Sequence, residues 1–482
     1  MSRLVVGPFN RVEGDLEVRL EVASDQVTRA EVVSPLYRGF EQMLRGKDPR
    51  DGLVIAPRIC GICSVSPSVA AAEALAAAQG LSPAPNGQLV TNIVHAVENI
   101  ADHLTHFYMF FMPDFTRETY GDAPWFAATA TRFAALKGTA AQDMLPQRAE
   151  FMHIVGLLAG KWPHTMAVQP GGVTRWVAAN EVQRLLGLLA TFRRFLQRVA
   201  IGVELEAFTA LGTRQALFEL VETHGPSHSD LFRFLQISEA LGLHQLGRAE
   251  DRFLSFGAYR QGSGHLFARG LRDRSGPQKL NTGLIAEDVS HAWMQGPERA
   301  LHPFEGVTEP DTEMAQGYTW CKAPRLAGDP AEVGALARQV VAEHPLALDL
   351  VAQGGNVEAR IVARFLEMAL LVPAMERWLR EIRPPDAFIA HGDTPPETEG
   401  AGLVEAARGA LGHWLRVEGG KIANYQIIAP TTWNFSPRDA AGRPGPLETA
   451  LVGASRRPGE TEPVAVQHIV RSFDPCMVCT VH

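Results

Sequence analysis

The chain has 482 residues, of which 20% are charged and 46% are hydrophobic, and its formal net charge is −8. This acidic balance argues against nucleic acid as a partner and provides no basic face for a membrane surface. No uninterrupted apolar run approaches the ~20 residues that cross a bilayer, and the first residues contain neither a signal peptide nor a twin-arginine motif.

The N-terminal part of the chain has the pattern of strands. Residues 1–35 alternate apolar and polar side chains, as in "LEVRLEVASDQVTRAEVV", which predicts half-buried strands. The pattern then changes to helical spacing, because the Ala-rich stretch "SPSVAAAEALAAAQG" closes on Gly80, a plausible helix end. A second helix follows, in which apolar residues recur every three or four positions: Ile93, Val97, Ile100, Leu104 and Phe107.

Two further stretches, 181–210 and 356–382, show broad apolar faces typical of helices, and Pro373 predicts a kink in the second. Residues 255–330 are rich in Gly, Pro and polar side chains, which predicts loops with short strands. The expected fold class is therefore mainly α with a small N-terminal β element. We expect one large domain, 1–482, with a β-containing segment at 1–58 and a mainly helical body at 59–482.

Four of the five cysteines form two Cys-x-x-C pairs, Cys60 with Cys63 and Cys476 with Cys479. This usage indicates a reducing compartment, and such a pair lets two soft thiolates converge on zinc, iron or another transition metal. Two independent redox pairs and one structural zinc site are the alternatives. Zinc pairs usually lie within about 20 residues of each other, whereas these lie near opposite ends of the chain, so a shared site requires the C-terminal pair to fold back onto the N-terminal one.

The sequence as a whole resembles the large subunit of nickel–iron hydrogenases. "RICGICS" and the terminal "DPCMVCTVH" match the two signatures of that family. Six further blocks match in the family's order, two before the first signature and four between the signatures: "NRVEGDLEV" (10–18), "RGFEQMLRGKDPRD" (38–51), "HLTHFYMFFMPDF" (103–115), "YTWCKAPR" (318–325), "ARGALGHW" (407–414) and "YQIIAPTTWN" (425–434). The resemblance implies the large-subunit fold with a central helical bundle.

The resemblance also implies the ligands of a nickel–iron centre. Cys60 and Cys476 are expected as terminal nickel ligands, and Cys63 and Cys479 as bridges to an iron that carries carbon monoxide and cyanide. A magnesium ion near the C-terminus is expected on Glu41, the backbone carbonyl of Ile427 and His482, with waters completing the octahedron. Ligation by His482 would tie down a chain end that would otherwise fray.

Further residues match the family's reaction machinery. Arg408 is expected over the open face of the metals, and Thr431, which follows Pro430, is expected to donate to a cyanide. Asp114 and Asp474 match carboxylates that pair with the arginine. Heterolytic cleavage of H2 needs a base, for which Cys476 and Arg408 both remain candidates. Glu13 matches the carboxylate that passes the proton outward, although a solvated glutamate is the simpler interpretation without the family.

The expected partner is a small iron–sulfur subunit, because Cys321 is the one cysteine left over and cannot hold a cluster alone. The chain departs from the family's pattern at Pro67, a position often occupied by His, and at Ala407, often Pro. At two gas-channel positions it carries Ile62 and Phe110 in place of smaller Val and Leu.

Bulky channel residues, the "CSVS" variant and the absence of a C-terminal extension resemble the cytoplasmic regulatory hydrogenases. That group senses hydrogen and signals through a histidine kinase bound to the small subunit, and it implies a cytoplasmic location and oxygen tolerance. The absent extension fits either a processed chain or a group made without one. An energy-conserving cytoplasmic uptake hydrogenase is the alternative, and a zinc-stapled structural protein is the remote one.

Overall fold

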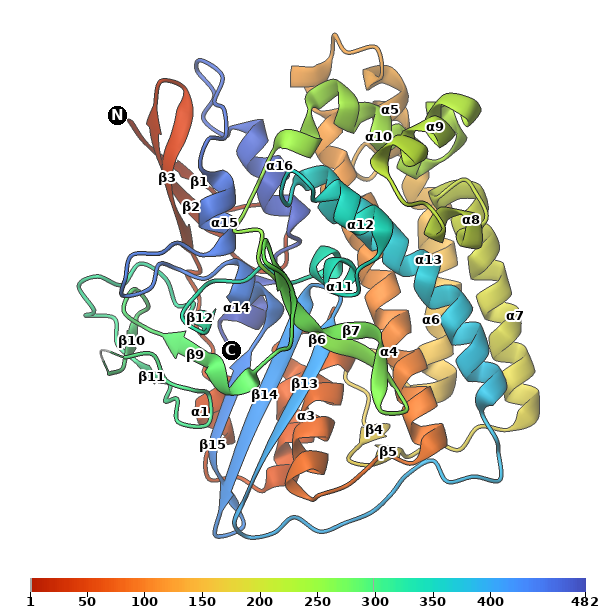
Figure 1. Cartoon of the computed structure of the whole chain (residues 1–482), viewed down its shortest axis with the longest axis vertical. Helices are drawn as coiled ribbons and strands as arrows, with labels where there is room; N and C mark the ends of the chain where they lie inside the picture. Colours follow the sequence, from red (N-terminus) through yellow and green to blue (C-terminus); the bar gives the residue numbers. More distant parts are fainter. Residues whose placement is uncertain (1, 298) are drawn as a thin grey trace.

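The computed structural model describes residues 2–297 and 299–482 of the chain. Helices dominate, as the sequence predicts, and the long helices α4, α6, α7 and α13 run together along one side of the molecule (Figure 1). In chain order the α-helices are α1 (Phe40–Leu44), α2 (Gly52–Ile55), α3 (Val65–Ala78), α4 (Pro85–Thr105), α5 (Phe126–Phe133), α6 (Thr139–Ala159), α7 (Ala179–Phe195), α8 (Leu205–Thr209), α9 (Arg214–His224), α10 (Asp230–Leu241), α11 (Ala335–Val341), α12 (Pro345–Leu350), α13 (Val357–Glu381), α14 (Pro430–Asn434), α15 (Pro446–Leu451), α16 (Val464–Ser472) and α17 (Met477–Thr480).

The strands in the described residues form small antiparallel sheets. Three sheets have three strands, in the orders β1-β2-β3, β6-β7-β8 and β13-β14-β15, and β4-β5, β9-β12 and β10-β11 are two-stranded. Their bounds are β1 (Ser2–Val6), β2 (Glu17–Ala23), β3 (Gln26–Val33), β4 (Val168–Gln169), β5 (Gly172–Val173), β6 (Phe253–Gln261), β7 (Gly264–Asp273), β8 (Gly276–Gln278), β9 (Ile285–Asp288), β10 (Met294–Gln295), β11 (Glu309–Pro310), β12 (Ala323–Leu326), β13 (Thr398–Ala406), β14 (Gly409–Glu418) and β15 (Lys421–Ile428).

The N-terminal β element is confirmed as the sheet β1-β2-β3. Along β2 the side chains of Val18, Leu20 and Val22 are buried and the residues between them are more exposed, which is the alternation that predicted a strand. The short strands predicted between residues 255 and 330 are also present, as β6 to β12.

The predicted helices are present too. Helix α3 ends where Gly80 adopts a left-handed φ of 67°, a conformation that glycine adopts without steric cost. The apolar stripe from Ile93 to Leu104 lies on α4 and is fully buried. Pro373 lies inside α13 without ending it; the kink at that position stays a prediction.

The sheet β13-β14-β15 lies within the mainly helical body and was not predicted from the sequence. Strands β13 and β14 each contain two glycines, and β14 is buried along nearly its whole length, so β14 lacks the alternation of a half-exposed strand. Strand β13 packs directly on α3, because Gly400 and Gly402 have no side chain there. A Cβ at Gly402 would overlap the carbonyl oxygen of Ala70, and one at Gly400 that of Ala74.

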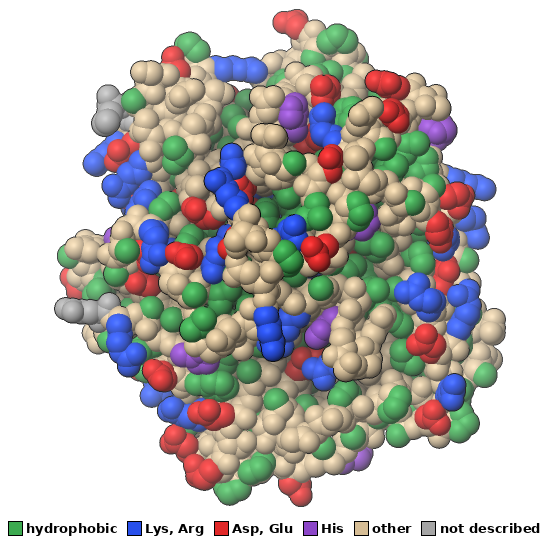
Figure 2. All heavy atoms as spheres, viewed as in Figure 1, with side chains coloured by type: hydrophobic (Ala, Val, Ile, Leu, Met, Phe, Trp, Pro, Cys, Tyr) green, Lys and Arg blue, Asp and Glu red, His purple; other side chains and the backbone are tan. Residues whose placement is uncertain are grey.

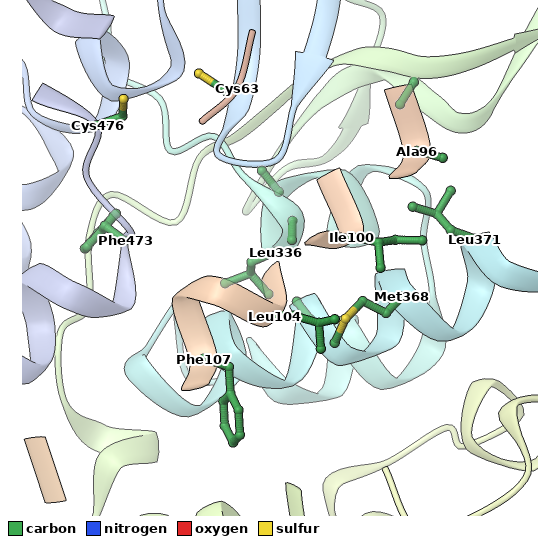
Figure 3. Packing of buried hydrophobic residues seen from close by; sticks show 14 of the residues in the cluster. Cys63, Ala96, Ile100, Leu104, Phe107, Leu336, Met368, Leu371, Phe473 and Cys476 are labelled. Carbon is green, nitrogen blue, oxygen red and sulfur yellow. The ribbon is translucent and has the colours of Figure 1, made fainter. Parts of the chain in front are cut away.

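The main hydrophobic core joins the bundle to the segments that carry the cysteines. In Figure 3, Ile100 and Leu104 of α4 face Met368 and Leu371 of α13, and the same core extends to Cys63 and Cys476. The visible surface is different, since acidic and basic side chains are interspersed over it (Figure 2). Among the described residues, we find no helix with the length and apolar character that a membrane crossing requires.

Candidate metal centre

The four paired cysteines meet at one buried point. The sulfur atoms of Cys60, Cys63, Cys476 and Cys479 all lie within 4.8 Å of one another, and all four thiols are free. The Sγ atoms are 3.6 Å apart between Cys60 and Cys476 and 3.4 Å apart between Cys63 and Cys479. In the described part of the chain no other group of three or more His, Cys, Asp or Glu residues converges in this way. The structure therefore brings the two ends of the chain together, as the sequence predicts.

Backbone and side-chain contacts hold the two cysteine segments against each other. Glu13 forms a parallel β-bridge with Cys476, in which the N–H of Met477 donates to the Glu13 carbonyl at 2.7 Å. Arg38 links the pairs, because its Nη2 donates to the carbonyl of Ile59 at 2.5 Å and to the carbonyl of Val478. The terminal segment is thus fixed by the N-terminal part of the chain.

Four thiols in one buried site oppose one another's ionisation. Contacts with the sulfurs of Cys476 and Cys479, followed by burial, raise the pKa of Cys63 well above its ordinary value. The same two neighbours donate to Cys60 and lower its pKa. The four thiols cannot all ionise together without a cation, because buried negative charge needs compensation. A soft transition-metal ion removes this conflict, so the donor set fits such an ion.

Arg408 is held beside the cysteines by two carboxylates. It occupies the two-residue turn between β13 and β14, where Gly409 follows with a φ of 130° that favours glycine. Its guanidinium donates to Asp102 at 2.5 and 3.1 Å, to the side chain of Asp474 at 3.1 Å and to the Asp474 carbonyl at 2.9 Å. Burial lowers the pKa of Arg408, but the charges of Asp102 and Asp474 outweigh it and raise that pKa well above its ordinary value. Arg408 is therefore a fixed cation.

Asp114 is not a partner of Arg408, which corrects the pairing expected from the sequence. Asp114 is fully buried and accepts from Arg471 at 2.8 Å, from Arg117 at 3.0 Å and from Arg11. Asp114 lies in the short 3-10 segment Met112–Thr116, the second helical segment after α4, whereas Asp102 lies on α4 itself and pairs with Arg408. Asp102, on α4, is therefore the aspartate that reaches the site.

A cavity next to the sulfurs provides space for metal-bound ligands. Arg408, Pro430 and Thr431 line it together with Cys63, Cys476 and Cys479. The Oγ1 of Thr431 accepts from the backbone N–H of Cys476 at 3.0 Å, which leaves the hydroxyl proton free to donate into the cavity. Pro430 contributes an apolar wall with no N–H. These residues fit small ligands that accept hydrogen bonds beside a metal.

Glu13 lies at the edge of this centre. Its side chain is half-buried, and burial, followed by the nearby Cys60 thiol, raises its pKa above the usual value. A carboxyl with a raised pKa close to the cysteines is suited to hold a proton on its way out.

The residues expected at the magnesium site also converge. His482 Nε2 lies 3.3 Å from Glu41 Oε1, which accepts from the backbone N–H of Ile427 at 2.8 Å. Lys322 Nζ lies 3.1 Å from the other oxygen of Glu41 and 3.4 Å from Glu287, whose Oε1 has no partner in the described residues. A carboxylate and an imidazole fit an ion that keeps several waters, and the unpaired oxygen of Glu287 fits one of those waters.

Comparisons with known proteins agree with this geometry. The family model described as nickel-dependent hydrogenase matches residues 38–120 and 141–482. The chain belongs to the nickel-dependent hydrogenase family. It is 29% identical to the periplasmic [NiFeSe] hydrogenase large subunit of Desulfomicrobium baculatum and 27% identical to the hydrogenase-1 large chain of Escherichia coli, with 100% of this chain and 95% of each relative covered. The Ni-Fe-Se hydrogenase of D. vulgaris Hildenborough in the reduced state superposes with a TM-score of 0.84 at 28% identity over 100% of both chains.

The hydrogenase fold and enzyme class expected from the sequence are thus confirmed, and nickel and iron belong to the centre of this family. The two expected gas-channel residues do not line the cavity beside the cysteines. Ile62 and Phe110 are both half-buried, Ile62 between Cys60 and Cys63 and Phe110 in the π-helical turn η3 (His106–Phe111). Their role in gas access stays a prediction.

Sequence reasoning missed three residues of this hydrogenase site: Asp102, Arg38 and His413. Asp102 lies on the face of α4 opposite the apolar stripe and is buried together with other polar residues, such as Glu98 and Asn99, so the apolar periodicity gave no signal for it. Arg38 begins the matched block "RGFEQML", but its two acceptors are backbone carbonyls, which no side-chain pattern reveals. His413 lies inside the matched block "ARGALGHW", where its place on the cavity wall becomes visible only in the folded sheet.

Proposed function

We propose that this chain activates dihydrogen heterolytically at a nickel–iron centre held by Cys60, Cys63, Cys476 and Cys479. The observation that supports the proposal is the convergence of four free thiols beside a buried guanidinium. A structural zinc staple needs the four sulfurs but has no use for a buried cation next to them, nor for an adjoining cavity.

In this proposal Cys60 and Cys476 are terminal nickel ligands, and Cys63 and Cys479 bridge nickel and iron. The centre, with carbon monoxide and cyanide on its iron, supplies the Lewis acidity that makes dihydrogen acidic enough to be cleaved. Arg408 and Thr431 donate hydrogen bonds to ligands in the cavity, and Pro430 closes an apolar side of it.

The net reaction converts one H2 into two protons and two electrons. Two carboxylates hold Arg408 as a cation, so it orients and stabilises rather than accepting a proton, and the Cys476 thiolate is the proposed base. Glu13 receives the proton next, because its backbone pairs with Cys476 and its side chain is half-buried. Asp474 and Asp102 act through Arg408 as positioning residues.

A magnesium ion on Glu41, the Ile427 carbonyl and His482 completes the proposal. Because His482 Nδ1 also contacts the carbonyl of Cys479 at 2.7 Å, this ion would anchor the segment that carries the C-terminal cysteine pair. Its contribution is therefore to folding and metal loading.

A cysteine-to-serine pair of variants tests the ligand assignment. Cys479→Ser is expected to lose nickel and hydrogen oxidation, because a hydroxyl is too hard and too basic to bridge these metals. Cys321→Ser is the matched control, since Cys321 is equally buried but donates to the carbonyl of Lys322 at 3.2 Å, outside the centre. Nickel content by elemental analysis is the readout. A Cys479→Ser protein that keeps its nickel would contradict the assignment.

We propose further that the chain works with a small iron–sulfur subunit in the cytoplasm, as a hydrogen sensor coupled to a histidine kinase. A partner must carry the electrons, because Cys321, the only cysteine outside the centre, is alone and fully buried. The bulk of Ile62 and Phe110 favours the sensor, which tolerates slow turnover in air. An uptake role is the alternative, because relatives such as that of Azotobacter chroococcum are named uptake hydrogenase large subunit.

The double variant Ile62→Val, Phe110→Leu tests the sensor proposal. If the two side chains narrow the route to the metals, smaller ones should admit oxygen faster, since in a tightly packed interior a single methylene matters. The measurement is residual hydrogen oxidation after timed exposure to air, at equal nickel content. Ile55→Val, a half-buried site in α2, is the control for general loosening. Unchanged oxygen tolerance in the double variant would contradict the proposed role of these residues.

A further inference from the structure

His413 is a buried histidine on the wall of the cavity beside the cysteines. It lies on β14, and its side chain points to the same face of the strand as that of Leu411, because alternate residues share a face. Both residues line the cavity, together with Cys63 and Ile427. Its side chain is completely shielded from solvent.

One ring nitrogen of His413 is paired and the other is not. Nδ1 lies 2.8 Å from the hydroxyl of Tyr425, which is the residue on β15 that shares a strand face with Ile427. Nε2 has no hydrogen-bond partner among the described residues. Buried polar atoms without a partner are rare, so this nitrogen needs an explanation.

The pairing with Tyr425 indicates which nitrogen carries the proton. The Tyr425 hydroxyl is buried, and Nδ1 is its only hydrogen-bond partner in the described part of the chain. If the hydroxyl donates to Nδ1, a single group stays unpaired, the Nε2–H. The opposite arrangement leaves two groups unpaired, the Tyr425 proton and the Nε2 lone pair, and each costs about 1–3 kcal/mol. Nε2 is therefore the protonated nitrogen.

With Nδ1 paired to the Tyr425 hydroxyl, Nε2–H is the donor that the ring has left to offer. The neighbours of His413 along the cavity wall are apolar at Leu411, Pro67 and Ala429. Within the described residues the protein thus offers this proton no oxygen or nitrogen acceptor, although the cavity itself has room for one.

We propose that the Nε2–H of His413 donates a hydrogen bond to a small ligand of the iron that occupies this cavity. The inference rests on the proposed function, and it adds a third donor to Arg408 and Thr431. The acceptor would be an anionic diatomic group, because such a group offers a terminal lone pair and occupies little volume. Tyr425 acts through His413 by fixing its tautomer.

Infrared spectroscopy of the complex with its small subunit tests this role, because iron-bound cyanide and carbonyl absorb where proteins do not. His413→Phe keeps a flat ring and removes the donor, so one cyanide band should shift while nickel content stays constant. His413→Gln places an amide N–H near the position of Nε2 and should return that band toward its original frequency. Tyr425→Phe removes the hydroxyl that fixes the His413 tautomer, so both tautomers should be populated and the same band should split in two.

His344→Phe is the control, because His344 is a half-buried histidine that contacts the carbonyl of Thr209, away from the cavity. Bands that stay in place in nickel-loaded His413→Phe would overturn the inference, as would equal shifts in His413→Phe and His413→Gln. If His413→Phe does not load nickel, the Gln and Tyr425→Phe variants decide by the same criteria. A parent complex without any such bands would contradict the proposed function itself.

Discussion

At the scale of single residues, the arrangement of charges explains which aspartate serves the metal centre. Asp102 and Asp114 are both fully buried, but Asp102 holds Arg408 whereas Asp114 holds Arg471. Asp114 lies in the matched block 103–115 and Asp102 comes directly before it, so matching the sequence to the family pointed to Asp114 alone. Their different partners predict different defects.

Asp102→Asn is expected to lower hydrogen turnover about 10- to 100-fold, the usual effect of losing a residue that orients groups around a metal site. The amide keeps the size of the side chain and removes the charge that fixes Arg408. Nickel content should not change. The measurement is turnover per nickel in Asp102→Asn and in Asp114→Asn; a larger loss per nickel in the Asp114 variant would contradict the assignment.

Asp114→Asn is expected to act on stability. It leaves Arg471 buried without a counter-charge, which costs about 3–5 kcal/mol. Burial alone would raise the pKa of Asp114, but His468, Arg471 and Arg11 outweigh it and hold that pKa well below its usual range. A depressed pKa stabilises the fold above the unfolded-state value of about 3.9, and this contribution is lost as the pH falls below it. The gap in Tm between parent and variant should therefore narrow on acidification; a constant gap would contradict this account.

At the scale of elements, the contact between α3 and β13 sets the position of two site segments. Helix α3 begins two residues after Cys63, and β13 leads into the turn that holds Arg408. Their close approach depends on the absence of side chains at Gly400 and Gly402. This sheet escaped prediction because β13 and β14 contain glycines and β14 is buried on both faces, which weakens the β propensity and the alternation that mark a strand. Strands β1 to β3, in contrast, alternate between buried and exposed residues and are rich in strand-forming residues, so they were predicted.

Gly402→Ala is expected to destabilise the protein by about 1–3 kcal/mol, as overpacking of an interior does. The added methyl meets the backbone of Ala70, which cannot rotate away, so α3 must move from the sheet and nickel loading should fall as well. Gly156→Ala is the matched control, because Gly156 lies within α6 with open space around its Cα. That variant should be neutral or more stable by about 0.5–1 kcal/mol. Equal Tm values for both variants would show that the close contact is unimportant.

At the scale of the whole molecule, the metal centre joins the two ends of the chain inside one core. The sequence was sufficient for the helical bundle, the N-terminal strands and the meeting of the cysteine pairs, since long periodic segments and paired thiols leave clear patterns. It was not sufficient for contacts with backbone carbonyls, such as those that Arg38 makes. It also could not tell whether Asp102 or Asp114 pairs with Arg408. Those depend on how elements far apart in sequence pack together.

The infrared spectrum of the purified complex, recorded together with its nickel content, tests the central claim most directly. A centre bridged by Cys63 and Cys479 predicts nickel in the chain and absorption by iron-bound carbon monoxide and cyanide in a region where proteins are transparent. Zinc bound to the four cysteines, with no nickel and no absorption in that region, would contradict the claim.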